Sequence, residues 1–319
     1  MEETSKTVKV RHRGRIGQVP IYLGKLFRMF FYMDDWKCIP MSAVIAALVA
    51  FVAASGMFKN MEGTLKGALA LSCVCIWNGF FNSIQVVCRE RDIIKREHRN
   101  GMHISSYLCA HMIFQALLCL VQVVVTITVC YFGGMKFGDR YGYIITNFMV
   151  EIGITMFILT YSADMLSLML SCIAKNTTAA MTMMPFMLIF ELLFSDTVFE
   201  LPSNIKKLAD LSIAKWGITA ICSQSNYNSQ PMISVWNMLS KFWSVEVNGR
   251  KPIYEIMKAI EDSGNRENFN ATIGYYSQKA DYVMSRTNIL NCWMAIIMFT
   301  LIFMIVAVLA LENVDKDKR

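Results

Sequence analysis

The stretch CRERDIIKREHRNGMH, residues 88–103, decides how the rest of the sequence is read. Eight of the eleven residues from Arg89 to Arg99 are charged, yet the chain on either side is almost wholly apolar. So dense a charge cluster between two apolar segments is typical of a loop that joins two membrane spans.

The composition agrees with a membrane protein. Of the 319 residues, 55% are hydrophobic and only 17% are charged, and the mean hydropathy is +0.40. An average soluble domain is much more polar. A bilayer core of about 30 Å needs roughly 20 apolar residues per helix, and several runs reach this length.

Six membrane-spanning helices are expected, in an all-α fold. Pro40 opens the first at a first-turn position, where its missing N–H costs little, and Pro185 lies within the fifth. Few residues separate the fourth from the fifth, so these two are expected to form a tight antiparallel hairpin. The six runs are residues 39–58, 65–88, 104–132, 143–174, 177–199 and 288–311.

Charge asymmetry predicts the orientation, because lysine and arginine gather on the cytoplasmic side. Eight basic residues precede the first span and five lie between the second and third, whereas the loops after the first and third spans hold two each. Both termini and the 89–103 loop are therefore expected to be cytoplasmic. The outer segment at 200–287 has ten basic and eight acidic residues, so it needs no anionic partner, and no nucleic acid is expected.

The N-terminal region is predicted to hold an amphipathic helix at 16–37, after a basic arm at 1–15. Its apolar side chains recur every three or four residues, at Val19, Tyr22, Leu23, Leu26, Phe27 and Phe30. Such a helix would lie in the inner interface, with its basic residues near anionic headgroups. The alternative is a solvated basic arm.

In the outer segment, residues 207–222 are expected to form a short helix that enters the outer leaflet, sheltered by protein. Residues 248–252 and 262–270 are predicted to be turn and exposed loop.

Motifs for catalysis and metal binding are missing from the sequence. Cys-x-x-Cys spacing does not occur and the four histidines are scattered, so no metal site is expected. There is no GxxxxGK[ST] phosphate loop and no nucleophile elbow, so no catalytic residue or cofactor is assigned to this chain. An outer disulfide between Cys222 and Cys292 has weak support.

Asp164 is the ionisable residue predicted deepest in a span, and such residues are often functional. It would serve either a polar relay or a proton-linked substrate site, or it is a carboxyl hydrogen-bonded to Thr160, Ser162 or Ser167. The second interpretation is favoured.

The charged loop itself allows two interpretations. A short helix pinned between two spans would suit docking in a cleft of a cytosolic protein, whereas a solvated loop would satisfy the positive-inside rule alone. Glu90, Arg91, Glu97, Gly101 and Tyr107 occur in the order and spacing that resemble the first cytoplasmic loop of type-two ABC transporter permeases, especially the G-subfamily. Residues 192–202 and 212–221 resemble that family's end of span five and its outer re-entrant helix.

This resemblance implies a G-type ABC exporter membrane domain at 38–319, with the N-terminal helix as the connecting helix. It implies a homo- or heterodimer of permease chains, embedded in membrane lipid, and an ABC ATPase that binds ATP and Mg. The ATPase would be a separate subunit, since this chain lacks the domain. The expected role is export of a hydrophobic or amphipathic substrate across the plasma membrane by alternating access, and the lack of a cleavable signal suits a bacterium.

The resemblance also implies site residues. The loop at 89–103 would couple the membrane domain to the ATPase, through Glu90, Arg91, Lys95, Arg96, Glu97 and Gly101. The substrate slit falls on Asn78, Phe81, Pro185 and Ile189, and the outer gate on Asp196, Thr197 and Val198. Arg28 or Lys25 is expected to pair with Glu97 at the inner interface.

Two positions depart from the family pattern. The family commonly has an aromatic residue where Asn78 stands and glycine where Asp196 stands, which puts aromatic stacking of the ligand and the construction of the gate in doubt.

Two other classes of function stay open. A non-transporting sensor or scaffold would signal through the charged loop to a cytosolic partner. A membrane enzyme acting on lipid would use Asp164 or His111, and is disfavoured because these residues lie at different depths.

Overall fold

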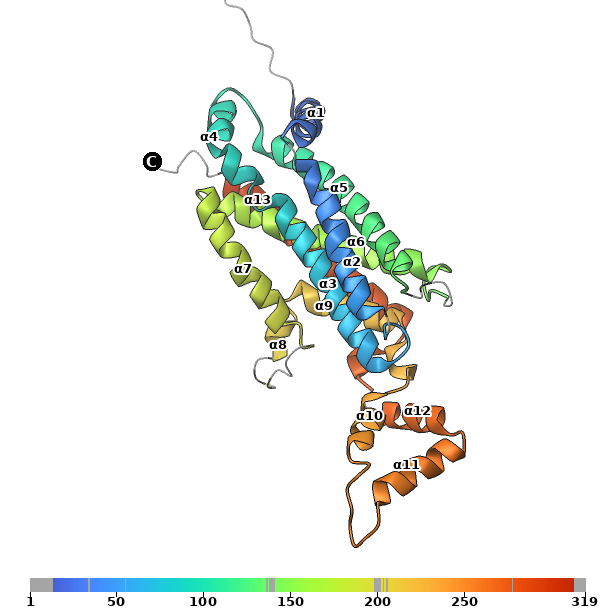
Figure 1. Cartoon of the computed structure of the whole chain (residues 1–319). Helices are drawn as coiled ribbons and strands as arrows, with labels where there is room; N and C mark the ends of the chain where they lie inside the picture. The colour runs from blue at the N-terminus through green and yellow to red at the C-terminus, as the bar shows by residue number, and fades with distance from the viewer. Residues whose placement is uncertain are drawn as a thin grey trace, which may run out of the picture.

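A computed structural model describes residues 14–312, except 34, 55, 136, 138–140, 198–201, 203, 205 and 277. The basic arm at 1–13 therefore lies outside the described residues. Every regular element in the described part is a helix, and the all-α prediction is confirmed. The bundle in Figure 1 contains α2 (Cys38–Ala53), α3 (Met61–Ser83), α5 (Ile104–Phe132), α6 (Phe148–Ile173), α7 (Thr177–Leu193) and α13 (Arg286–Glu312).

Within the described residues, five helices are long and apolar enough to cross a membrane, and α7, with 17 residues, is shorter. The prediction for the third span, 104–132, matches α5 at both ends. The fourth begins later than expected, at Phe148, because Asn147 caps the helix by accepting from the N–H groups of Met149 and Val150. The chain before it makes an antiparallel bridge between Tyr141 and Asn147.

Helix α6 lies at the centre of the bundle, and most of its residues are buried. It packs closely on α3 because Gly79 has no side chain: a Cβ there would lie 2.5 Å from the carbonyl oxygen of Thr160. Small residues allow two helix backbones to approach closely in membrane proteins. In contrast, α13 and α2 carry large exposed apolar side chains on their outer faces, such as Phe51 and Ile305.

Helices α1 (Arg15–Tyr32) and α4 (Val86–Arg99) lie at one end of the bundle. The 3-10 turn η1 (Asp35–Lys37) connects α1 to α2, and a break at residues 84–85 separates α4 from α3. The apolar face of α1 packs on α5, where Leu26 joins Ala110, Phe114 and Leu118 in one buried cluster. The predicted amphipathic helix is thus present, and α5 covers part of its apolar face, whereas Phe27 is 40% exposed.

The opposite end holds the segment between α7 and α13. It contains α8 (Lys206–Ala209), α9 (Ile213–Gln224), η2 (Tyr227–Ser229), α10 (Ser234–Lys241), α11 (Pro252–Asp262), α12 (Arg266–Tyr276) and η3 (Ala280–Tyr282). Helix α9 is almost wholly buried against α3, α6 and α13, as expected for a sheltered short helix. Helices α10–α12 project beyond the bundle in Figure 1.

The expectation of exposed loops at 248–252 and 262–270 is only partly correct. A turn with positive φ does occur at Asn248 and Gly249, but much of the second stretch is helical. Pro252 stands at the first helical position of α11, which favours a helix start. Trp236 packs edge-on against Phe269, with ring centroids 5.8 Å apart, so these helices share an apolar contact that exposed loops would lack.

Candidate functional site

Helix α4 contains most of the charged stretch at residues 88–103. The residues Ile84 and Gln85 separate it from α3. It ends at Arg99, and Gly101 follows two residues later with a φ of 94°, which suits glycine. The helix is amphipathic, because Val87 and Ile94 are buried whereas Ile93 is 40% exposed. One face of α4 therefore belongs to the bundle and the other faces outward.

Arg91 joins α4 to the end of α6. Its guanidinium donates from one nitrogen to the carbonyl oxygens of Cys172 and Ala174, both at 2.9 Å. The last carbonyls of a helix have no partner within the helix and form the negative end of its dipole, so a cation is stabilised there. Because Arg91 is buried, this contact fixes the position of α4 against α6.

Glu90 joins α4 to two other helices at once. Its Oε2 accepts from Lys25 Nζ of α1 at 3.1 Å and from the Tyr107 hydroxyl of α5 at 3.2 Å. The Glu90 side chain is 8% exposed and that of Lys25 is 31% exposed. A carboxylate can be buried in this way when it is paired and hydrogen-bonded.

A second row of contacts ties α1 to the end of α4. The Tyr22 hydroxyl donates to Glu97 Oε2 at 3.2 Å. The Gln18 amide donates to the Gly101 carbonyl at 3.0 Å and accepts from the His103 backbone N–H at 2.9 Å. Burial, followed by the negative charge and hydrogen bond of Glu97, raises the pKa of Tyr22 to about 12, so this hydroxyl remains a donor at neutral pH.

The expected pairing of Arg28 with Glu97 is wrong. Arg28 Nε donates instead to the Gly24 carbonyl of its own helix at 3.1 Å and is exposed. The alternative donor, Lys25, lies one turn closer to the N-terminus and meets Glu90. The register of α1 on α5, set by its apolar face, thus decides which basic residue reaches α4.

The six predicted coupling residues divide by environment. Glu90 and Arg91 are buried within the chain, and the Gly101 carbonyl is bound to Gln18. Lys95 and Glu97 are half-buried. Arg96 is exposed, and Asp92 and Ile93, which the prediction did not include, are exposed on the same face. The 3.6-residue period of the helix is the signal that places these two residues on the face of Arg96.

The predicted slit residues do not share one face. Asn78 is 6% exposed, whereas Phe81 is 51% exposed. The side chain that accompanies Phe81 on the surface of α3 is Trp77, with ring centroids 5.7 Å apart. On α7, Pro185 and Ile189 are both exposed. The spacing of four between Trp77 and Phe81 is the signal for this aromatic pair.

The predicted outer gate is described only in part, because Val198 lies outside the described residues. Asp196 has a φ of 54°, in the left-handed region, and its carboxylate lies 3.9 Å from Lys206 Nζ. The Thr197 hydroxyl donates to the Ser195 carbonyl at 3.1 Å. Where the family commonly has glycine, this chain thus places an aspartate in a backbone conformation that glycine favours.

Asp164 is fully buried in α6 and is hydrogen-bonded, as favoured from the sequence. The donors are not the predicted neighbours on its own helix: Ser83 Oγ of α3 donates to Oδ1, and Cys119 Sγ of α5 donates to Oδ2. Ser167 instead binds the Phe80 carbonyl. Asp164 therefore joins three helices.

Asp164 and His111, the two residues that a membrane enzyme acting on lipid would use, contact different groups. His111 packs against the ring of Tyr107, with centroids 4.5 Å apart, and shares no contact with the Asp164 cluster. Among the described residues, no group of three or more His, Cys, Asp or Glu side chains could hold a metal ion. Cys222 and Cys292 are both free and buried, so the disulfide considered from the sequence is absent.

The fold thus defines a multi-pass helical membrane protein with a charged helix at one end. Residues 27–224 match the family model described as ABC-2 type transporter, which is more than half of the chain. The chain belongs to this family, and it is a type-2 ABC permease membrane domain. No curated protein matches the chain.

Proposed function

We propose that the chain is the membrane-spanning subunit of an ATP-driven exporter in the plasma membrane of a bacterium. In this proposal two permease chains, identical or not, form a dimer, and a separate ATPase subunit that binds ATP and Mg docks on each. Both termini, α1 and α4 lie on the cytoplasmic side, in agreement with the excess of basic residues there. The substrate is hydrophobic or amphipathic.

The observation that carries the proposal is the division of α4 into two faces. The inner face is fixed to α6 by Arg91 and to α1 and α5 by Glu90. The outer face presents Asp92, Ile93 and Arg96 to the surroundings. A helix held in this way transmits a displacement to three other helices as a rigid body.

The proposed cycle follows from these contacts. Closure of the ATPase pair on ATP displaces α4, and the displacement reaches α6 through Arg91 and α1 through Glu90 and Glu97. The bundle then switches from inward-open to outward-open. The surface pair Trp77 and Phe81, with Pro185 and Ile189 of α7, lines the substrate slit, and Asn78 supports it from the buried side.

The test uses the exposed face of α4. The chain is purified from its native membrane in mild detergent, co-purified proteins are identified by mass spectrometry, and their ATPase activity is measured. Ile93→Asp and Arg96→Glu are expected to reduce the co-purified ATPase at least fivefold. The matched control is Ile256→Asp on α11, where the isoleucine is 60% exposed at the opposite end of the molecule.

Absence of an ATPase from the parent preparation would refute the proposal. If an ATPase binds through α4 but no hydrophobic compound stimulates its activity, the sensor or scaffold function replaces transport. Equal loss of the partner in the Ile256→Asp control would mean that the substitutions act through general instability.

A further inference from the structure

A cavity of about 470 Å³ lies between the α1–α4 end and the bundle. It is bounded by α1, η1, the break between α3 and α4, α5, and Met181 of α7. This volume is within the range of sites that hold drug-sized ligands. All its walls come from one chain, and Phe81 is the only predicted slit residue among them.

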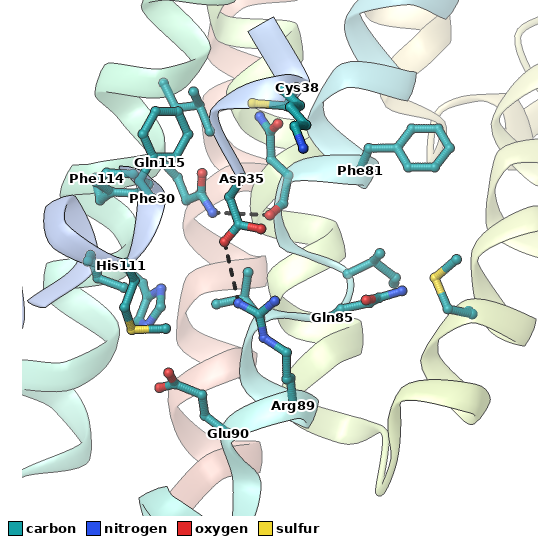
Figure 2. Close-up of a pocket in the computed structure, with 18 residues that line it drawn as sticks. Phe30, Asp35, Cys38, Phe81, Gln85, Arg89, Glu90, His111, Phe114 and Gln115 are labelled. Atoms are coloured by element: carbon teal, nitrogen blue, oxygen red, sulfur yellow. Dashed lines mark hydrogen bonds and ion pairs between the residues drawn. The ribbon is translucent and has the colours of Figure 1, made fainter. Parts of the chain in front are cut away.

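Two buried side chains on the α5 wall carry polar atoms that have no hydrogen-bond partner. Both ring nitrogens of His111 and the Oε1 of Gln115 are buried and unpaired, in side chains that are only 1% and 2% exposed. The other end of the Gln115 amide donates to the Asn82 carbonyl at 3.4 Å, which fixes the amide. Figure 2 shows His111 and Gln115 on the same side of the cavity.

Buried polar atoms are nearly always paired in folded proteins, so unpaired ones at a cavity indicate a ligand that pairs them. The Gln115 oxygen needs a donor. A neutral imidazole offers one donor and one acceptor. A hydroxyl group both donates and accepts, so it is complementary to these two side chains together.

The charges of the cavity leave no excess for a charged ligand. Lys37 and Arg89 oppose Asp35 and Glu90 in its lining, so the formal charges cancel. The Arg89 guanidinium lies 3.4 Å from the Asp35 carboxylate, drawn as a dashed line in Figure 2. Glu90 is paired with Lys25. The carboxylates of Asp35 and Glu90 and the guanidinium of Arg89 are thus already paired, and a charged ligand would have to compete with these pairs.

The remaining walls are apolar, with Leu26, Phe30, Ile84, Phe114 and Leu118 among the lining residues. The rings of Phe30 and Phe114 meet with centroids 5.6 Å apart. Hydrocarbon is favoured against such walls because its transfer from water is favourable.

We propose that this cavity is a binding site for an uncharged amphiphile whose hydroxyl-bearing head pairs with His111 and Gln115 while its hydrocarbon lies against the phenylalanines. Phe81 is the residue that this lining shares with the proposed substrate slit, and the proposal rests on the cavity itself and not on the transport function.

The test uses three amphiphiles with closely similar monounsaturated hydrocarbon tails and different heads. The parent protein in lipid nanodiscs is labelled with a monoacylglycerol that carries a diazirine and an alkyne in its chain, and labelled peptides are mapped by mass spectrometry. Labelling is expected in the α1 and α5 peptides that contain Phe30 and Phe114. Monooleoylglycerol should compete at concentrations at least tenfold lower than oleate, which is anionic, or oleylamine, which is cationic.

Variants test the two polar side chains separately. His111→Leu and Gln115→Leu are expected to reduce labelling at least fivefold. Thr128→Val is the matched control, since Thr128 lies exposed on the same helix and its hydroxyl binds only the Val124 carbonyl at 2.7 Å. Because His111→Leu removes two unpaired buried nitrogens, its melting temperature without ligand should not fall.

Three results would each overturn the proposal. The first is labelling spread evenly over lipid-facing helices, which would mean that water alone fills the cavity. The second is equal competition by oleate or oleylamine, which would mean that only the acyl chain is recognised. The third is unchanged labelling in both leucine variants. The competition experiment needs only the parent protein, so misfolding of a variant does not affect it.

Discussion

Glu90 illustrates how a single side chain here links elements far apart in the sequence. Its carboxylate binds a lysine 65 residues earlier and a tyrosine 17 residues later. Charge patterning places Glu90 in the charged stretch between two spans, and the family resemblance assigns it to coupling with the ATPase. The structure shows that its side chain is buried and holds α1 against α4 and α5.

Replacement of Glu90 by glutamine should weaken this contact without changing its shape. Removing one partner of a fully buried ion pair costs about 3–5 kcal/mol. Lys25 is about a third exposed and can be resolvated, so we expect a loss of about 1–2 kcal/mol in the free energy of unfolding. Denaturation in detergent micelles, followed by circular dichroism, measures it.

The control for this substitution is Lys251→Met, which removes an ion pair of 3.4 Å with Glu246 in which both side chains are exposed. Exposed pairs contribute about 0–1 kcal/mol. If the two variants lose the same stability, burial of Glu90 does not strengthen its pair.

At the scale of elements, helix α9 depends on a carboxylate from another helix. Glu191 of α7 accepts from the Ser212 hydroxyl at 2.8 Å and from the backbone N–H of Ala214 at 3.0 Å. These groups belong to the N-terminus of α9, which has unpaired N–H groups and the positive end of the helix dipole. The buried glutamate is therefore part of the anchor of α9.

Glu191→Ala should loosen the first turn of α9 and lower the free energy of unfolding by about 1–3 kcal/mol, because a cap and a buried hydrogen bond are both lost. Hydrogen–deuterium exchange of the backbone amides at 213–216 should become faster than in the parent. Glu255→Ala, at an exposed position of α11, should leave that exchange unchanged. Unaltered protection of α9 in Glu191→Ala would show that packing alone holds the helix.

At the scale of the whole molecule, α7 presents large apolar side chains that its own chain does not cover. Phe186 and Ile189 are 69% and 53% exposed, and Figure 1 shows α7 standing away from the other helices along part of its length. In the proposed dimer this face meets the second chain.

The dimer prediction is tested with single introduced cysteines in a background where Cys38, Cys73 and Cys109 are serine, since these three native cysteines are not buried. Ile189→Cys should form a disulfide-linked dimer on mild oxidation in the membrane. Ile305→Cys on α13, where the isoleucine is 60% exposed, should remain monomeric on denaturing gels. Equal crosslinking at both positions would indicate random collision, and no crosslinking at Ile189 would place this face against lipid.

The sequence by itself determined the membrane class and the position of α5, because burial in lipid requires long apolar runs whose ends are set by polar residues. It also identified the amphipathic N-terminal helix and the buried state of Asp164. Each of these follows from the period or length of a local pattern.

Only the tertiary structure decided the partners of the charged residues. The sequence paired Arg28 with Glu97 and placed Asn78 and Phe81 on one face, whereas the fold brings Lys25 to Glu90 and buries Asn78. Helix register and rotation within a bundle depend on packing between distant segments, such as the close approach of α3 and α6 at Gly79. Local periodicity fixes which residues share a helix face, but packing fixes what that face meets.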